Sequence, residues 1–408
     1  MARRRKRKKH IFPRLLLFIC IIAVSAGAVT AAGWSLPRLV RSVGETVNTV
    51  AQPQAEFPEL TVDVEEVDGS FYYQQLNEKE QQIYREILQA VQAMEEETYI
   101  HAGRDDDVAK VYECLLYDRP ELFWCDGSSQ MTVYEEYTEL YPGYTCTESE
   151  KEQRQQQIEQ AERECLSGAD AGMSEYEKIK YIYEYLVQTI DYDESAPDNQ
   201  NIYSSLVGKR SVCAGYSRAA QYLLEQMGIE CIYVTGTIRG QGSHAWNIVK
   251  CNDTYYQMDV TFGDPVFLEA ESGESIPHTS INYDYLCCTD EVLFTDHIQN
   301  DFVPYPPCDA DDLDYYRLNG MYYDNFDPDL LLRDMNQSIY NGEESFVCKF
   351  SDENVYSQAR DEIIDNLIPR AAKNLADTYG LSRVRYTYVD DGTHRRISVF
   401  WDYGESKS

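Results

Sequence analysis

In the middle of the chain, the spacing of apolar residues changes from that of a helix to the alternation of a strand. This change constrains the fold more than any other feature of the sequence. Ser211 is expected to cap a helix that ends near Gly228, because apolar side chains recur at helical spacing between them. The predicted buried stripe is Tyr216, Ala219, Ala220, Leu223, Leu224 and Met227. Strands are expected over residues 231–236, 244–250 and 254–260, with a polar turn before the third. A helix followed by an antiparallel sheet predicts the α+β class.

Helical patterns precede this block, and an acidic stretch follows it. Upstream, helices are expected over residues 76–99, 150–166 and 174–190, and Ser174 with Glu177 forms a capping box for the third. Downstream, an acidic run over residues 309–314 is interpreted as a solvated linker.

The residues beyond that acidic run predict a small, separate α/β module. A helix is expected over residues 355–379, interrupted by Pro369, and strands are expected over residues 384–389 and 396–401.

The N-terminus predicts the location of the protein. Residues 3–9 are all Lys or Arg, and residues 15–34 contain no charged side chain. An uncharged stretch of this length can cross a bilayer as a helix, and its basic flank stays in the cytoplasm. We therefore expect a single-pass cell-membrane protein with an extracellular C-terminal domain. A cleaved signal peptide is the alternative, because small residues gather over residues 25–33.

The charge of the chain excludes one class of partner. The formal net charge is −34, and none of the 70 acidic residues lies in the first 41 positions. Such an acidic body repels phosphate backbones, so nucleic acid is not expected as a partner.

Cys213 has the sequence surroundings of a reactive thiol. It falls in the first turn of the expected helix, where the helix dipole favours negative charge, and Lys209 and Arg210 lie just upstream. His244 begins one strand, and Asp259 closes the next. An aspartate there can accept a hydrogen bond from one imidazole nitrogen and leave the other to face the sulfur. Cys213, His244 and Asp259 are therefore the candidate nucleophile, base and orienting carboxylate.

Four short motifs carry a family resemblance. They are Ser211-Val-Cys-Ala-Gly-Tyr216, Met227-Gly-Ile229, His244-Ala-Trp-Asn247, and Met258-Asp-Val-Thr261 followed by Asp264-Pro265. With these motifs in this order, residues 201–264 resemble the transglutaminase-like superfamily in its bacterial form. The resemblance implies a papain-like fold and a catalytic triad of Cys213, His244 and Asp259. Phe262 stands where such bacterial domains often carry Trp, which is a mild departure.

The resemblance completes the predicted order of parts along the chain. These are a basic cytoplasmic N-terminus (1–14), a transmembrane anchor (15–34), a stalk or linker (35–69), a transglutaminase-like domain with an N-terminal helical region (70–308, core 174–268) and a C-terminal α/β module (309–408).

The expected reaction is acyl transfer at an amide or peptide bond through a thioester on Cys213. Water as the second nucleophile would make the protein a protease or amidase, and an amine would make it a crosslinker. The expected substrate is a protein or peptide, and cell-wall peptides are the suggestion for a host with a wall. The alternative hypothesis is a catalytically silent peptide- or protein-binding surface module on the same fold. A further option places Cys213 in a disulfide.

No cofactor and no metal are expected. His101, His278, His297 and His394 show no ligand spacing, and the sequence has no CxxC pair of the kind found in zinc sites. The disulfide pattern of the twelve cysteines stays open.

Overall fold

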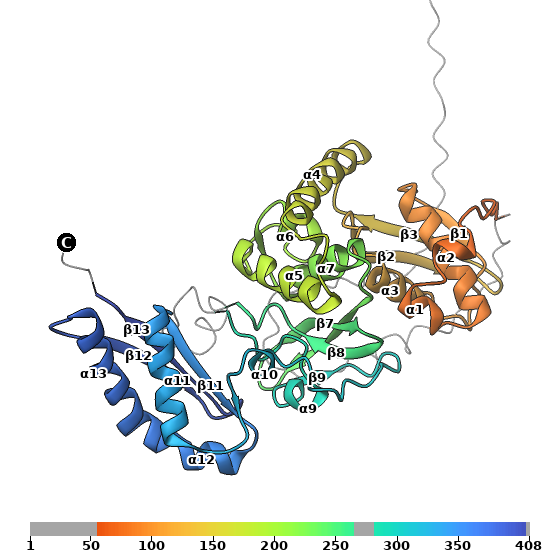
Figure 1. Cartoon of the computed structure of the whole chain (residues 1–408). Coiled ribbons are helices and arrows are strands. Elements are labelled where there is room, and N and C mark those ends of the chain that lie inside the picture. Colours follow the sequence, from red (N-terminus) through yellow and green to blue (C-terminus); the bar gives the residue numbers. More distant parts are fainter. Residues whose placement is uncertain (1–54, 265–280, 405–408) are drawn as a thin grey trace, which may run out of the picture. The chain divides into compact units, whose positions relative to one another are not determined.

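The computed structural model describes residues 55–264 and 281–404 (Figure 1). The described part of the chain divides into two compact units. The first contains the described residues to Leu116 together with Trp124–Glu148, and the second contains Tyr117–Phe123 and the described residues from Ser149 onward. Helices and mainly antiparallel sheets build both units, so the fold belongs to the α+β class, as predicted.

The first unit has a three-stranded antiparallel sheet in the order β1-β3-β2. Its elements are η3 (Val64–Glu66), α1 (Phe71–Gln74), α2 (Glu78–Gln92), β1 (Thr98–Ile100), α3 (Val108–Asp118), β2 (Cys125–Val133) and β3 (Thr138–Tyr144). The helix predicted over residues 76–99 therefore ends early. Met94 has a φ of 51°, which breaks the helix, and Thr98 pairs with Leu140 of β3.

The end of the predicted stalk is part of the folded first unit. Val62 and Val67 are buried, and Thr61 donates its backbone N–H to the side chain of Gln89 on α2 at 2.6 Å. The prediction of a linker over residues 35–69 is therefore wrong for this stretch. Two buried valines and hydrogen bonds to α2 hold this stretch, and the valines form no periodic pattern in the sequence.

The core of the second unit is a helix packed on a four-stranded sheet with the order β8-β7-β6-β9 (Figure 1). The helix is α7 (Cys213–Gln226), and the strands are β6 (Cys231–Ile238), β7 (Ser243–Cys251), β8 (Thr254–Met258) and β9 (His297–Gln299). Asn252 and Asp253 both have positive φ, as a tight β7–β8 hairpin turn requires. The sequence predicted this helix and three of the strands, but not β9.

The second unit contains further helices and two short strands. They are α4 (Glu148–Ser167), α5 (Glu175–Thr189), β4 (Asp191–Tyr192), α6 (Ile202–Leu206), β5 (Arg210–Ser211) and α9 (Asp290–Leu293). The predicted capping box of α5 is present, because Ser174 and Glu177 bond to each other's backbone N–H groups. Both α5 and α6 pack against α7.

The remaining elements form the segment that we call the C-terminal module, which has a four-stranded sheet in the order β10-β11-β13-β12. It comprises β10 (Tyr322–Tyr323), α11 (Pro328–Asn341), β11 (Ser345–Phe350), α12 (Glu353–Glu362), the π-helix η4 (Ile363–Leu367), α13 (Ile368–Tyr379), β12 (Arg385–Asp391) and β13 (Arg396–Asp402), and α10 (Tyr315–Leu318) precedes it. It has an apolar core of its own, which includes Leu331, Phe350 and Ile397. The predicted domain boundary between residues 308 and 309 stays a prediction.

The expected interruption of the long C-terminal helix takes the form of the π-helix η4. Pro369 follows it at the start of α13. A proline removes one helical hydrogen bond and crowds the preceding turn, and the wider π-turn accommodates both effects.

Within residues 55–264 and 281–404, no helix is both long and apolar enough to cross a membrane. The predicted anchor over residues 15–34 lies outside the described residues.

Candidate functional site

Cys213 is the first residue of α7 and is a half-buried free thiol. The residue before it, Val212, occupies the N-cap position. Ser211 does not cap this helix, contrary to the prediction, because its hydroxyl donates to the carbonyl of Asn199 at 2.7 Å. The sulfur thus lies at the positive end of a fourteen-residue helix, where a thiolate is favoured.

Gly215 lets the start of α7 approach its surroundings closely. A Cβ atom at this position would lie 1.9 Å from the Ser211 hydroxyl and 2.7 Å from the Ser205 hydroxyl. The absence of a side chain therefore helps to fix the place of Cys213.

The two basic residues upstream of Cys213 have partners elsewhere. Arg210 forms an ion pair with Asp193, and the ammonium of Lys209 lies over the ring of Tyr185. We had expected these two charges to favour the Cys213 thiolate, but in the structure both side chains are directed to other partners. The positive group beside Cys213 is His244.

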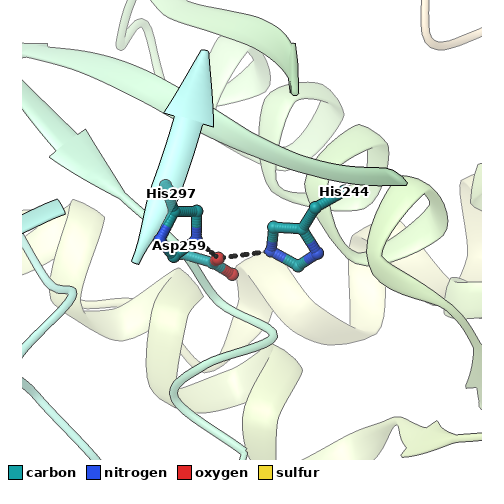
Figure 2. Close-up of side chains that lie close together, drawn as sticks. All are labelled: His244, Asp259 and His297. Atoms are coloured by element: carbon teal, nitrogen blue, oxygen red, sulfur yellow. Dashed lines mark hydrogen bonds and ion pairs between the residues drawn. The ribbon is translucent and has the colours of Figure 1, made fainter. Parts of the chain in front are cut away.

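His244 connects the thiol to a buried carboxylate. It lies on β7, and its Nε2 is 2.6 Å from Oδ2 of Asp259, which directly follows β8 (Figure 2). The Cys213 side chain makes a hydrogen bond with the same ring, which leaves Nδ1 of His244 for the sulfur. The structure thus brings together the three residues that the sequence singled out.

Asp259 has a second imidazole partner that the sequence did not predict. Nε2 of His297 on β9 is bonded to the same Oδ2 atom (Figure 2), and the two atoms are 2.9 Å apart. Nδ1 of His297 is 2.5 Å from Asp296. The other carboxylate oxygen of Asp259 accepts the backbone N–H groups of Thr261 and Phe262 at 2.8 and 3.1 Å. Asp259 is completely buried and has four hydrogen bonds, which hold it in one orientation.

A glycine allows β9 to approach the sheet closely enough for His297 to reach Asp259. Gly236 on β6 lies opposite both His244 and Gln299. A Cβ atom there would be 2.2 Å from the carbonyl oxygen of Ile298 and 2.6 Å from the ring of Trp246. Any side chain at position 236 would therefore displace β9.

The electrostatics of the site favour charged imidazoles around a charged carboxylate. Burial by itself would lower the pKa of His244, but the Asp259 carboxylate and the Cys213 sulfur raise it to about 10. Burial would also lower the pKa of His297, but its hydrogen bonds to Asp259 and Asp296 raise it. Conversely, burial would raise the pKa of Asp259, yet His244 and His297 hold it well below its usual range. These directions support an imidazolium at His244 and a carboxylate at Asp259 at neutral pH.

Two groups of described residues bring three potential metal-ligand atoms within 4.8 Å of one another: His244 with Asp259 and His297, and Asp284 with Asp391 and His394. In the first group the carboxylate is already bonded to both imidazoles. In the second, the Arg396 guanidinium bonds to both carboxylates and supplies the positive charge. Neither arrangement requires a metal, and the expectation of no metal stays a prediction.

The comparison with protein families identifies the central part of the chain. Residues 163–260 match the transglutaminase-like superfamily. We call this segment the transglutaminase-like domain, after the superfamily whose model it matches. It contains Cys213, His244 and Asp259 in the order that the motifs predicted.

Two solved structures are similar to parts of this chain. One is a transglutaminase with 13% identity and a TM-score of 0.25, and the match covers 40% of this chain and 50% of that one. The other is a candidate cysteine protease from Cytophaga hutchinsonii with 14% identity and a TM-score of 0.24, covering 33% of this chain and 57% of that one. The chain thus spans between 50% and 57% of the length of these structures. The search of curated proteins finds no match.

Other motif residues of the transglutaminase-like domain build its scaffold. Trp246 is completely buried in the core and donates its Nε1–H to Gln257 at 2.9 Å. Asn247 donates to the carbonyl of Ser217 at 3.1 Å and so ties β7 to α7. His297 lies beyond the family match, on a three-residue strand, where neither the motifs nor a hydrophobic period could indicate it.

Proposed function

We propose that the protein is a thiol enzyme that acts on amide bonds, with Cys213 as nucleophile, His244 as acid and base, and Asp259 as the orienting carboxylate. One observation carries the proposal: the buried His244–Asp259 pair, with a separation of 2.6 Å, presents its free ring nitrogen to a thiol at the N-terminus of α7. A nucleophile, a base and an orienter in hydrogen-bond sequence are what acyl transfer needs.

The proposed reaction begins with the Cys213 thiolate, which attacks the carbonyl carbon of an amide. The oxyanion that forms is stabilised by the backbone N–H of Cys213 at the start of α7. The His244 imidazolium donates its proton to the departing nitrogen, the C–N bond breaks, and a thioester and a free amine or ammonia result. His244, now neutral, takes a proton from the second nucleophile, which attacks the thioester and releases the Cys213 sulfur as a thiolate.

The second nucleophile decides the outcome. Water gives an amidase or protease, and a primary amine gives a crosslinker. The proposed substrates are proteins or peptides, and the peptide stems of a cell wall are the first to test. The proposed location is the outer face of a cell membrane, which the basic cluster over residues 3–9, the uncharged residues 15–34 and the acidic remainder of the chain support.

The test compares the full chain with its Cys213→Ala variant under reducing conditions. Each protein is incubated with a Gln-containing protein or a wall peptide and a fluorescent primary amine. Amine incorporation, ammonia release and new peptide termini are measured. Cys146→Ala is the matched control, because Cys146 is also half-buried.

Activity in the wild type and in Cys146→Ala, together with its loss in Cys213→Ala, is the expected result. If the wild type is as inactive as Cys213→Ala with every substrate, the acyl-enzyme proposal fails. Binding of the same peptides by the inactive wild type would then make the protein a peptide-binding module.

A further inference from the structure

A second buried cluster of charges, outside the triad, joins the C-terminal module to the rest of the second unit. The carboxylate of Asp284 is completely buried and lies 3.0 Å from Nζ of Lys349 and 2.7 Å from Nε of Arg396. Lys349 is on β11 and is itself only 4% exposed, and Arg396 is on β13. Lys349 also lies 3.1 Å from Asp314, which belongs to the acidic run once expected to be solvated.

The charges in this cluster depend on one another. Burial would raise the pKa of Asp284, but Arg396 and Lys349 hold it well below its usual range. Removing one partner of such a buried pair leaves an uncompensated charge, which is strongly unfavourable. The cluster therefore fixes the position of Asp284 firmly relative to β11 and β13.

Asp284 lies in a segment that runs beside the catalytic carboxylate. Its neighbour Tyr285 accepts the backbone N–H of Asp259 at 2.9 Å. On either side, Asn282 donates its N–H to Gly263 at 3.1 Å, and Cys288 exchanges two backbone hydrogen bonds with Gln257, each of 2.9 Å. Residues 282–288 thus act as an additional backbone partner for the stretch that contains Asp259.

Tyr285 reaches Asp259 by a second route, through its side chain. Its hydroxyl donates to Asp296 at 2.6 Å, and Asp296 is bonded to His297 at 2.5 Å. His297 in turn holds Asp259 at 2.9 Å (Figure 2). The Tyr285 ring also packs edge-on against His394 of the C-terminal module, with 5.2 Å between the ring centroids.

We propose that the C-terminal module positions the catalytic carboxylate: Lys349 and Arg396 fix Asp284, and Tyr285 beside it holds Asp259 directly through its carbonyl and indirectly through Asp296 and His297. Tyr285 and His297 are positioning residues in this scheme, since they act on the reaction through Asp259. The inference rests on the proposed function for its activity readout, and the coupling itself can also be measured without activity.

The test uses two variants of the full chain, each with a matched control. Tyr285→Phe removes only the hydroxyl, and Tyr256→Phe, which removes another Tyr–carboxylate bond of 2.8 Å, is its control. Lys349→Met removes one charge of the cluster. Its control is Arg360→Met, because Arg360 pairs with carboxylates within the C-terminal module.

Two readouts are followed: the rate of Cys213 alkylation by iodoacetamide as a function of pH, and hydrogen exchange at the Asp259 amide. Thermal melting establishes that each variant is folded. Small misplacements of a catalytic group cost up to about a hundredfold in rate, so we expect Tyr285→Phe and Lys349→Met to slow alkylation by roughly ten- to a hundredfold. Exchange at Asp259 should accelerate in both variants, and neither control should change either readout.

Unchanged alkylation and unchanged exchange at Asp259 in folded Tyr285→Phe and Lys349→Met would overturn the inference. If the wild-type Cys213 thiol reacts no faster than an unstructured cysteine, the proposed function has failed. Hydrogen exchange at the Asp259 amide then decides by itself whether the C-terminal module positions Asp259. If Lys349→Met does not fold, Tyr285→Phe decides it.

Discussion

Replacing Asp259 by Asn removes one negative charge from the centre of the site and leaves the shape of the side chain intact. The Asn oxygen can still accept the N–H groups of Thr261 and Phe262, but an NH₂ group would face the imidazoles of His244 and His297. Both imidazoles would lose the carboxylate that favours their charged forms. The substitution therefore tests the electrostatic role of Asp259 with little change in packing.

The expected magnitude follows from the contact distance. Asp259 is the first of the groups that raise the pKa of His244 to about 10, and the two side chains are 2.6 Å apart. An opposite charge at such a distance shifts a pKa by roughly 1–3 units, each unit corresponding to about 1.4 kcal/mol. In Asp259→Asn, the pKa of His244 should therefore fall by that amount toward its ordinary value of 6.5.

The assay is alkylation of Cys213 by chloroacetate, an anion whose attack depends on the neighbouring imidazolium. The rate should decline on the alkaline side as His244 loses its proton, with a midpoint near pH 10 in the wild type. Neutral chloroacetamide serves as the reagent control. Asp312→Asn is the variant control, since Asp312 accepts a Tyr256 hydroxyl at 2.8 Å and does not contact His244.

The reasoning is refuted if the alkaline midpoint of Asp259→Asn coincides with that of the wild type. A midpoint that moves equally in Asp312→Asn would also contradict it, because the shift would then not be specific to the His244 contact.

Three further predictions concern stability. Trp246→Phe removes the donor to the buried Gln257 oxygen, so the free energy of unfolding should fall by about 1–3 kcal/mol in urea titrations; an unchanged midpoint would contradict this. Gly215→Ala places a Cβ 1.9 Å from the Ser211 hydroxyl and should lower the free energy of unfolding by about 1–3 kcal/mol. In calorimetry, the double variant with Ser211→Ala should recover part of this lost stability. Since the folded pKa of His244 is raised, its stabilising contribution should be complete below pH 6.5 and lost as the pH rises through about 10. Unfolding midpoints that rise across this range would show the sign to be wrong.

Secondary structure was predicted best where a long hydrophobic pattern and a local motif indicate the same element. The helix α7 and the strands β6, β7 and β8 all have clear hydrophobic patterns, and the hairpin turn at Asn252 and Asp253 has the required residue types. Cys213 was therefore placed in the first helical turn correctly. Its cap was assigned wrongly, because the Ser211 hydroxyl bonds to a loop carbonyl that no local pattern indicates.

Contacts between residues that are far apart in the sequence could not be predicted from local sequence patterns. Strand β9 has only three residues, so its period is too short to recognise, and His297 on it meets a carboxylate 38 positions away. Asp284 lies 65 positions from Lys349 and 112 from Arg396, and each of these residues alone would be expected on the surface. Only the folded backbone shows that their charges meet.

The positions of the groups that hold Asp259 set an order in time during synthesis of the chain. Cys213 is made first, His297 follows well after it, and Lys349 and Arg396 come later still. On the proposed coupling, a nascent chain contains Cys213, His244 and Asp259 long before the residues that position Asp259. While synthesis continues, the nascent chain would thus carry a less reactive Cys213, and full reactivity would begin only once β13 has joined its sheet.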